Sequence, residues 1–391
     1  KTLSVIEWNT LLKFHWNRSS RFGIIFVTSG RLLKIVKPMN LLNQFALTLL
    51  LISSPIAIFA QEETVVKAQI IEGEDTEADR HYNAGISNLT AKNYAAALQD
   101  FTKAIELKPE FSLAYYNRGI TYMEMKDHSK SIADFNASIQ IDGNPDSHFS
   151  KGRCLEATGQ FEDAMAAYSL AIDGKKEYSQ AYYYRGVLNF NNKEYKTAVD
   201  DFTNAINFNK QYAYAYNDRG SAKRQLGDLK GAAADYAMAI QLDKSLTFVY
   251  NNLGSVKRKD GDLKGAVNEY SKAISLDSKY ALAYNNRGSA KFDLGDYDGA
   301  IQDFNKVIEL DPKYAYAYNN RAAAKFKLKD YKGAIEDCNK AIQLDPNYGY
   351  AYMNRGNAKE MARDDKGACE DWKKASQMGI ETAKSHIGDC K

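Results

Sequence analysis

Small and aromatic residues recur along residues 78–382 in a pattern that repeats every 34 residues. A repeat of this length is typical of stacked helical hairpins. Each unit therefore predicts two antiparallel helices, A and B. The nine units begin at Ala78, Ser112, Pro145, Ser179, Ala213, Thr247, Ala281, Ala315 and Gly349. The second step is 33 residues, and the missing residue falls in the Gly143-Asn144-Pro145 turn, where a deletion is tolerated.

Three positions of the unit explain how one hairpin closes. Position 8 is Gly in every unit except the eighth, which has Ala322, and position 20 is Ala in all but Ser131. Position 24 is aromatic in all but Cys338. Small residues at 8 and 20 let helices A and B approach closely, and the aromatic ring at 24 fills the space beside them. One hairpin cannot bury its apolar face alone, so the units are expected to stack.

The unit resembles the tetratricopeptide repeat (TPR). The residues of the seventh unit that match the family pattern are Tyr284, Gly288, Tyr297, Ala300, Phe304 and Pro312. This resemblance implies an all-α fold, a right-handed superhelical solenoid of nine helix-turn-helix units over residues 78–382. Residues 383–391 are expected to form a short C-terminal cap, because Ala383 and Ile387 have helical spacing. The A-to-B turn at Leu294–Tyr297 contains a Gly, whereas Lys329 stands there in the next unit and predicts a less favourable turn.

The segment before the repeats predicts export. Residues 39–60 are uncharged and mostly apolar, contain Pro55 and end at Ala60, which resembles a secretory signal peptide. An uncleaved membrane anchor is the alternative, because about 20 apolar residues span a bilayer. Residues 1–38 contain the basic region before this segment and are assigned no fold, and 61–77 form an acidic linker. We expect an extracytoplasmic protein, in the periplasm, with secretion or membrane anchoring as alternatives.

Composition and charge exclude several classes of protein. The chain is 45% apolar and 26% charged, with 6 Pro and 4 Cys, which excludes collagen, a disulfide mini-scaffold and a polytopic membrane protein. The net charge is +3, but residues 1–38 hold seven basic residues and one acid and contribute +6. Residues 61–391 therefore sum to −3, and we expect no nucleic-acid partner. A membrane contact is expected only through residues 41–60, if they are not cleaved.

Basic and acidic residues recur at fixed places in the unit. Position 7 is basic in seven units, position 23 is acidic in eight, and position 11 is Lys in units five to nine. One interpretation is a basic stripe for anionic ligands, and the other is a row of ion pairs that close each hairpin. The regular acids favour the ion pairs. The basic residues at position 7 are Arg118, Lys151, Arg185, Arg219, Arg287, Arg321 and Arg355.

The resemblance to TPR proteins also implies a concave groove lined by positions 2, 5, 6, 9 and 12 of helix A. Regularly spaced carboxamides can pair with the main chain of an extended peptide, as in the asparagine row of O-linked N-acetylglucosamine transferase repeats. Position 6 is interrupted by Ser150, Tyr184 and Asp218. The alternative is that these residues pack against the next unit. The candidate groove residues are Asn83, Asn117, Asn252, Asn286, Asn320 and Asn354 at position 6, with Tyr82, Tyr116, Phe149, Tyr183, Asn217, Asn251, Asn285 and Asn319 at position 5.

Cysteine and histidine supply no catalytic or metal site. Cys154 and Cys338 occupy core positions of the repeat, whereas Cys369 on the last helix and Cys390 in the tail are placed for a disulfide in an oxidising compartment. His81 and His148 fall at the aromatic position 4 and are expected in the core. The sequence shows no phosphate-binding loop, no HExxH and no nucleophile elbow.

These observations predict a protein that is not an enzyme and has no cofactor. It would be a scaffold that binds protein or extended peptide partners in the groove, outside the cytoplasm. One alternative is a carbohydrate- or anion-binding envelope protein, and another is a subunit that presents substrate to a separate enzyme. The oligomeric state is not predicted.

Overall fold

The computed structural model describes residues 70, 76–388 and 390. The chain divides into two units, Lys1–Ala60 and Gln61–Lys391, and all described residues belong to the second. The predicted basic region, the signal segment and most of the acidic linker lie outside the described residues. Between residues 76 and 388, no helix combines the length and apolar character that crossing a bilayer requires.

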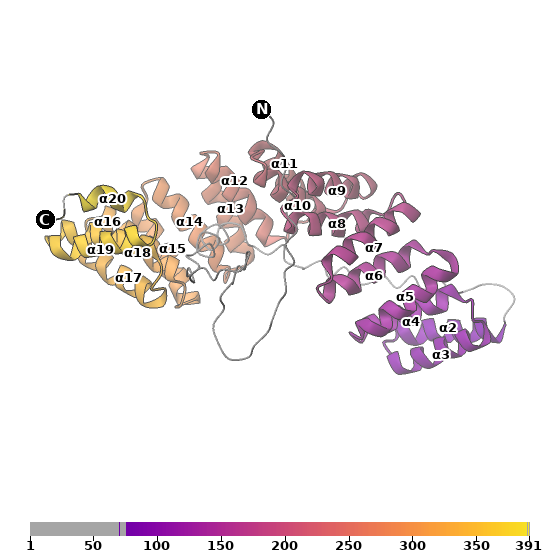
Figure 1. The fold of residues 1–391 in the computed structure, drawn as a ribbon. Coiled ribbons are helices and arrows are strands. Elements are labelled where there is room, and N and C mark those ends of the chain that lie inside the picture. The colour runs from indigo at the N-terminus through magenta and orange to yellow at the C-terminus, as the bar shows by residue number, and fades with distance from the viewer. Residues whose placement is uncertain (1–69, 71–75, 389, 391) are drawn as a thin grey trace, which may run out of the picture. The chain divides into compact units, whose positions relative to one another are not determined.

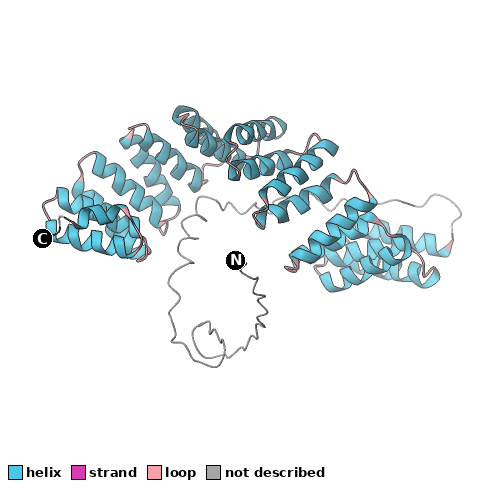
Figure 2. Cartoon of the chain, turned by 45° about the horizontal axis from the view of Figure 1, so that its top comes forward, coloured by secondary structure: helices cyan, strands magenta, loops and turns pink. Residues whose placement is uncertain are grey.

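The described part of the chain contains helices and no strands (Figure 2). They alternate as A and B helices of nine successive repeats. The A helices are α2 (Glu77–Thr90), α4 (Ser112–Glu124), α6 (Pro145–Ala157), α8 (Ser179–Asn191), α10 (Ala213–Gln225), α12 (Thr247–Lys259), α14 (Ala281–Asp293), α16 (Ala315–Lys327) and α18 (Gly349–Met361). The B helices are α3 (Tyr94–Leu107), α5 (His128–Asp142), α7 (Phe161–Gly174), α9 (Tyr195–Phe208), α11 (Leu229–Leu242), α13 (Leu263–Leu276), α15 (Tyr297–Leu310), α17 (Tyr331–Leu344) and α19 (Asp365–Gln377).

Successive helices are neighbours in space as well as in sequence (Figure 1). Each A helix packs against the B helix of its own repeat, and that B helix packs against the next A helix. Contacts of this kind, almost all between neighbours, define a solenoid. The prediction of an all-helical TPR-type solenoid is confirmed, and eight of the nine A helices begin at the first residue of the predicted unit.

The close approach of helices A and B depends on position 8. A Cβ atom built on Gly288 would lie 2.8 Å from Cε1 of Phe304, the ring at position 24, and one on Gly85 would lie 2.6 Å from Phe101. In the eighth repeat the pair changes together: Ala322 replaces Gly, and Cys338 replaces the ring. Both side chains are buried in one cluster. A smaller side chain at 24 therefore accommodates the added methyl group at 8.

Two residues after the end of each A helix, at position 15, the backbone enters the left-handed region. Four of these residues are Gly, such as Gly295 at φ 84°, and five are Lys or Arg, such as Lys329 at φ 65°. A side chain at positive φ costs about 1 to 2 kcal/mol, which glycine avoids. The less favourable turn predicted at Lys329 is therefore found in five of the nine repeats.

The last helix, α20 (Thr382–Ile387), closes the C-terminal end of the repeats. Ala383 on this helix is fully buried and packs with Ile380, Met353 and Trp372, while Ile387 lies at the edge of the same cluster. The predicted C-terminal cap is therefore present, and it covers an apolar face of α18 and α19.

Candidate partner-binding face

The predicted groove residues lie on the A helices, but they are not equally accessible. Tyr82, Tyr116 and Tyr183 are buried, so they do not offer ring surface to a partner as predicted. Phe149 is half-buried. The position-5 asparagines Asn217, Asn251 and Asn319 are buried as well, while Asn285 is half-buried.

The buried asparagines at position 5 are bonded to the next repeat. In repeats 5–9, the Nδ2 atom of each position-6 Asn donates a hydrogen bond to Oδ1 of the position-5 Asn of the preceding repeat. We call the eight residues of these four pairs the asparagine row. The pairs are Asn252 with Asn217 (3.1 Å), Asn286 with Asn251 (2.9 Å), Asn320 with Asn285 (3.2 Å) and Asn354 with Asn319 (2.9 Å).

Positions 5 and 6 also meet at the four junctions between repeats 1 and 5, where other side chains occupy them. Asn117 Nδ2 donates to the Tyr82 hydroxyl at 3.1 Å, and the hydroxyl of Tyr183 donates to Asp218 Oδ2 at 2.8 Å. Tyr116 is hydrogen-bonded to Ser150. The rings of Phe149 and Tyr184 lie 5.7 Å apart. Ser150, Tyr184 and Asp218, which interrupt the asparagines in the sequence, are thus partners of a ring at position 5.

These contacts support the alternative interpretation for position 5, namely packing against the next repeat. Position 6 differs, because three of its asparagines keep partly exposed carboxamides. Asn286, Asn320 and Asn354 are half-buried, and the bond to the preceding repeat uses one N–H of each carboxamide. Among the described residues, no further partner is recorded for the second N–H of these three side chains or for the oxygens of Asn320 and Asn354. A ligand main chain can therefore bond to them.

Asp218 is the one carboxylate at position 6, and it lies at the junction of repeats 4 and 5. It is 2% exposed and accepts hydrogen bonds from the Tyr183 hydroxyl and from Asn217 Nδ2, each at 2.8 Å. Burial raises the pKa of Asp218 to about 6, although these two hydrogen bonds lower it. Burial and the nearby Asp218 carboxylate raise the pKa of Tyr183 well above its ordinary value.

The recurring charges of the repeat form ion pairs inside the hairpins of repeats 2 and 4–9. In repeat 7, Arg287 binds Asp303 through Nε (2.9 Å) and Nη2 (2.6 Å), and Lys291 binds the same carboxylate at 2.9 Å. Arg287 also lies over the ring of Tyr284, and its Nη1 donates to Ser271 of the preceding repeat at 3.0 Å. The same bidentate arginine pair occurs in the repeats that contain Arg118, Arg185, Arg219, Arg321 and Arg355.

Repeats 1 and 4 lack one of these residues and fill its place in another way. Asn189 donates to Asp201 at 2.9 Å in repeat 4, where later repeats have Lys. Asp100 in repeat 1 is bonded by Asn88 and lies 3.3 Å from the ring of His81. His81 and His148 are predicted to lie in the core. Both are half-buried instead, so this prediction is wrong. The six arginines at position 7 are each bound to a carboxylate, which disfavours a basic stripe for anions.

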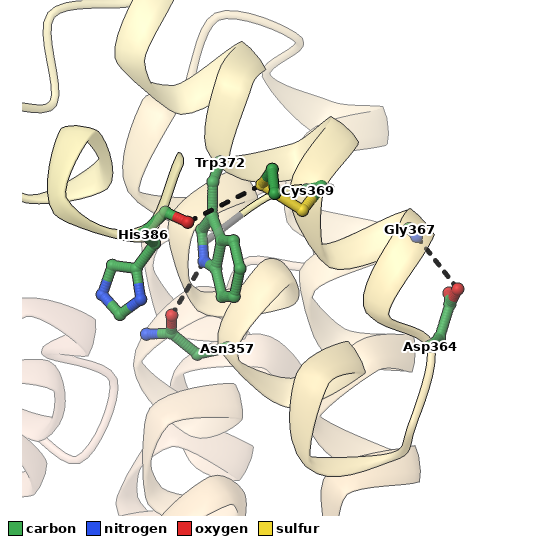
Figure 3. The surroundings of a disulfide bond; sticks show 7 residues. Asn357, Asp364, Gly367, Cys369, Trp372 and His386 are labelled. Atoms are coloured by element: carbon green, nitrogen blue, oxygen red, sulfur yellow. Dashed lines mark hydrogen bonds between the residues drawn. A yellow bond between two sulfur atoms is a disulfide. The ribbon is translucent and has the colours of Figure 1, made fainter. Parts of the chain in front are cut away.

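The cysteines divide into one bonded pair and two buried thiols. Cys369 and Cys390, the pair proposed from the sequence, are joined by a disulfide that ties the tail to α19 (Figure 3). Beside it, the His386 ring stacks on Trp372 at 4.7 Å, and Trp372 Nε1 donates to Asn357 (Figure 3). Cys154 and Cys338 are buried, as predicted. In the part of the chain that the structure describes, no cluster of three metal-ligating side chains occurs.

Comparison with known families assigns the repeats. Models described as TPR repeat or tetratricopeptide repeat match residues 78–111, 113–145, 254–292, 288–329 and 315–348. The chain is a tetratricopeptide repeat protein. The matched segments lie in repeats 1, 2, 6, 7 and 8 and have the same hairpin structure as the remaining four. The TPR family supports a role as a protein–protein interaction scaffold.

Two solved structures with TM-scores above 0.5 show the same fold. A tetratricopeptide repeat protein from Parabacteroides merdae is 19% identical, with a TM-score of 0.51, over 62% of this chain and 97% of that one. The C-terminal part of a TPR repeat-containing protein from Cytophaga hutchinsonii is 18% identical, with a TM-score of 0.52, over 61% and 98%. The crystal structure of MamA is 29% identical, with a TM-score of 0.39, and the match covers 42% of this chain and 96% of that one. No curated protein is similar enough in sequence to count as a match.

The hydrogen bonds between TPR units were not predicted from the sequence, although a signal for them exists. Residues at position 5 of one repeat and position 6 of the next are 35 residues apart, and their types change together: Tyr82 with Asn117, Tyr183 with Asp218, Asn251 with Asn286. Comparing positions within one unit does not reveal this, because the two residues belong to different units. A comparison at a spacing of 35 would have found it.

Proposed function

We propose that this TPR protein is a non-catalytic scaffold that binds protein or extended peptide partners along the A helices of its repeats, outside the cytoplasm. The observation that carries this proposal is the row of half-buried carboxamides at position 6 of α14, α16 and α18, which have hydrogen-bonding capacity beyond their bond to the preceding repeat. The recurring acids and bases are paired with one another in the hairpins, and this supports a role without catalysis.

The location outside the cytoplasm rests on two features. Residues 39–60 resemble a signal peptide in sequence. The disulfide between Cys369 and Cys390 suits an oxidising compartment. Fractionation of the source cells, followed by N-terminal sequencing, tests this part of the proposal. A start at Gln61 in the exported fraction is expected, and a cytoplasmic protein, another start or retention in carbonate-washed membranes would contradict it.

The scaffold itself is tested by chemical crosslinking of the tagged full-length chain in its native envelope, followed by mass spectrometry. The matched control is a tagged chain in which Asn286, Asn320 and Asn354 are replaced by Ala and helix content is checked by circular dichroism. At least one protein should be enriched with the natural chain and lost with the triple variant. If no protein is enriched above an untagged strain, the scaffold proposal fails.

A further inference from the structure

Repeat 9 is held differently on its two sides. On one side, α16 and α17 of repeat 8 pack against α18. On the other side lies the C-terminal cap, whose helix α20 has six residues and packs against α19. Isolated helices shorter than about 12 residues are marginal in water, so α20 depends on its contacts with repeat 9.

The apolar contacts of the cap are few. Ile380 and Ala383 are buried, and Ile387 is half-buried, in the cluster around Trp372. The ring of His386 stacks on Trp372 beside the disulfide (Figure 3). Two isoleucines, one alanine and one stacked ring contribute little apolar area by comparison with a complete hairpin. We therefore expect the covalent bond to supply a large part of the order of the cap.

The disulfide joins the cap to α19 across a short loop. Cys369 on α19 and Cys390 beyond α20 are 21 residues apart in sequence. A crosslink across a loop of this length restricts the open chain and so favours the closed one. Gly379 lies two residues after the end of α19 and has a φ of 86°. This glycine gives a released cap a point about which to turn.

Thiol–disulfide exchange is confined to this one bond. The chain has four cysteines, and Cys369 and Cys390 are both half-buried, so a small thiol can reach either sulfur. Cys154 and Cys338 are buried, and burial raises the pKa of both thiols, that of Cys338 to about 12. Exchange requires a thiolate, so the two buried thiols do not compete for the bond.

We propose that the Cys369–Cys390 disulfide is a redox-sensitive latch, which keeps the cap closed and repeat 9 ordered for its partner and is opened by a dithiol reductant. A thiolate of the reductant attacks one sulfur, and the other cysteine leaves as a thiolate and takes a proton. The second thiol of the reductant then displaces the first cysteine and closes a disulfide of its own. The reductant loses two electrons, and its two protons end on the two cysteine thiols.

Opening of the latch reaches the candidate partner-binding face through α18. A Cβ atom built on Gly349, the first residue of α18, would lie 2.9 Å from Cγ1 of Ile380. Tyr350 is the next residue, and Asn354 follows one turn later on the same side of the helix. Release of the cap removes one of the two neighbours of repeat 9, in a fold stabilised by contacts between neighbours. This consequence for binding rests on the proposed scaffold function.

Hydrogen exchange of the full-length chain, with and without dithiothreitol, tests the latch itself. We expect the amides of α20 to exchange about 100-fold faster after reduction, because the loop loses its crosslink. The amides of α18 and α19 should exchange faster by a smaller factor, and those of α14 should not change. Unchanged exchange in α20 would overturn the proposal.

The matched control is the double variant Cys369→Ser with Cys390→Ser. It should exchange at the rate of the reduced natural chain, and dithiothreitol should not alter that rate. In the reduced natural chain, iodoacetamide should label Cys369 and Cys390 but not Cys154 or Cys338, as mapped by mass spectrometry. Equally fast labelling of the two buried thiols would show that reduction unfolds the repeats, which would overturn a latch confined to the cap.

Crosslinking in the native envelope separates the latch from the scaffold. The double variant should capture a partner about tenfold less well than the natural chain, because a smaller fraction of repeat 9 is competent to bind. Equal capture by the two chains would overturn the control of binding by the disulfide. If the natural chain captures no partner either, the scaffold proposal fails, and the exchange rates decide the latch by themselves.

Discussion

Repeats 1–4 and repeats 5–9 have one backbone plan but join their A helices differently. In the first group, Tyr or Phe at position 5 meets Asn, Ser, Tyr or Asp at position 6 of the next repeat. In the second group, four Asn–Asn bonds of 2.9 to 3.2 Å perform this role. The comparison shows that these positions hold the repeats together throughout. In repeats 5–9 the asparagines at these positions also leave half-buried carboxamides on the surface. The junctions built on aromatic rings leave none.

The largest expected difference between the two regions concerns the arginine pairs. Arg185→Ala in repeat 4 leaves the buried Asp201 with a neutral partner, Asn189, and should cost about 3 to 5 kcal/mol. Arg287→Ala in repeat 7 leaves Asp303 paired with Lys291 and should cost less. Thermal unfolding followed by circular dichroism compares the two variants. An equal loss of stability would show that Lys291 does not compensate for the missing arginine.

The junction between the regions should depend on pH. The pKa of Asp218 is raised to about 6, from 3.8, so the folded state holds its proton more tightly than the unfolded chain. Protonation of Asp218 therefore contributes stability below about pH 4. This contribution is lost as the pH rises to about 6 and amounts to about 3 kcal/mol in total. Asp218→Asn should remove this dependence and raise stability at pH 7. Urea unfolding at pH 4 and pH 7 tests this, and an unchanged difference between the two pH values would contradict it.

Breaking one junction in each region sharpens the comparison further. Asn286→Ala leaves the buried Oδ1 of Asn251 without its donor and should cost about 1 to 3 kcal/mol. Tyr82→Phe removes an acceptor from Asn117, but Nδ2 of Asn117 keeps its bond to the Leu113 carbonyl, so the cost should be at most about 1 kcal/mol. Hydrogen exchange of the two flanking A helices measures each effect. A greater loss of protection in Tyr82→Phe than in Asn286→Ala would contradict the prediction that the Asn–Asn bond contributes more to stability.

The smallest effect is expected at the A-to-B turns, where both regions contain glycine and basic residues at positive φ. Lys329→Gly should stabilise the chain by roughly 1 kcal/mol, because glycine adopts the φ of 65° without strain. Gly295→Lys in the preceding repeat should destabilise it by a similar amount. The midpoint of thermal unfolding reports both. A lower midpoint for Lys329→Gly would mean that the lysine side chain makes a compensating contact.

The sequence predicts what one unit determines by itself. The helix starts, the Gly288 and Phe304 contact and the Arg287 and Asp303 pair all follow from spacing within 34 residues. The bonds between units do not, because Asn251 and Asn286 look like two equivalent exposed positions until the helices are stacked. Tyr82 and Asp218 are likewise buried by contacts between units, which the spacing within one unit does not reveal. Export from the cytoplasm remains a prediction, since the segment that resembles a signal peptide lies outside the described part of the chain.

The central claim is that the A helices of repeats 5–9 carry the partner. A photoreactive phenylalanine analogue in place of Tyr350, an exposed ring on α18, or of Gln302, an exposed residue on α15, tests it directly in the native envelope. We predict that irradiation links a partner polypeptide at position 350 and none at position 302. Labelling of the same protein from position 302 alone would place the partner on the B helices and contradict the account.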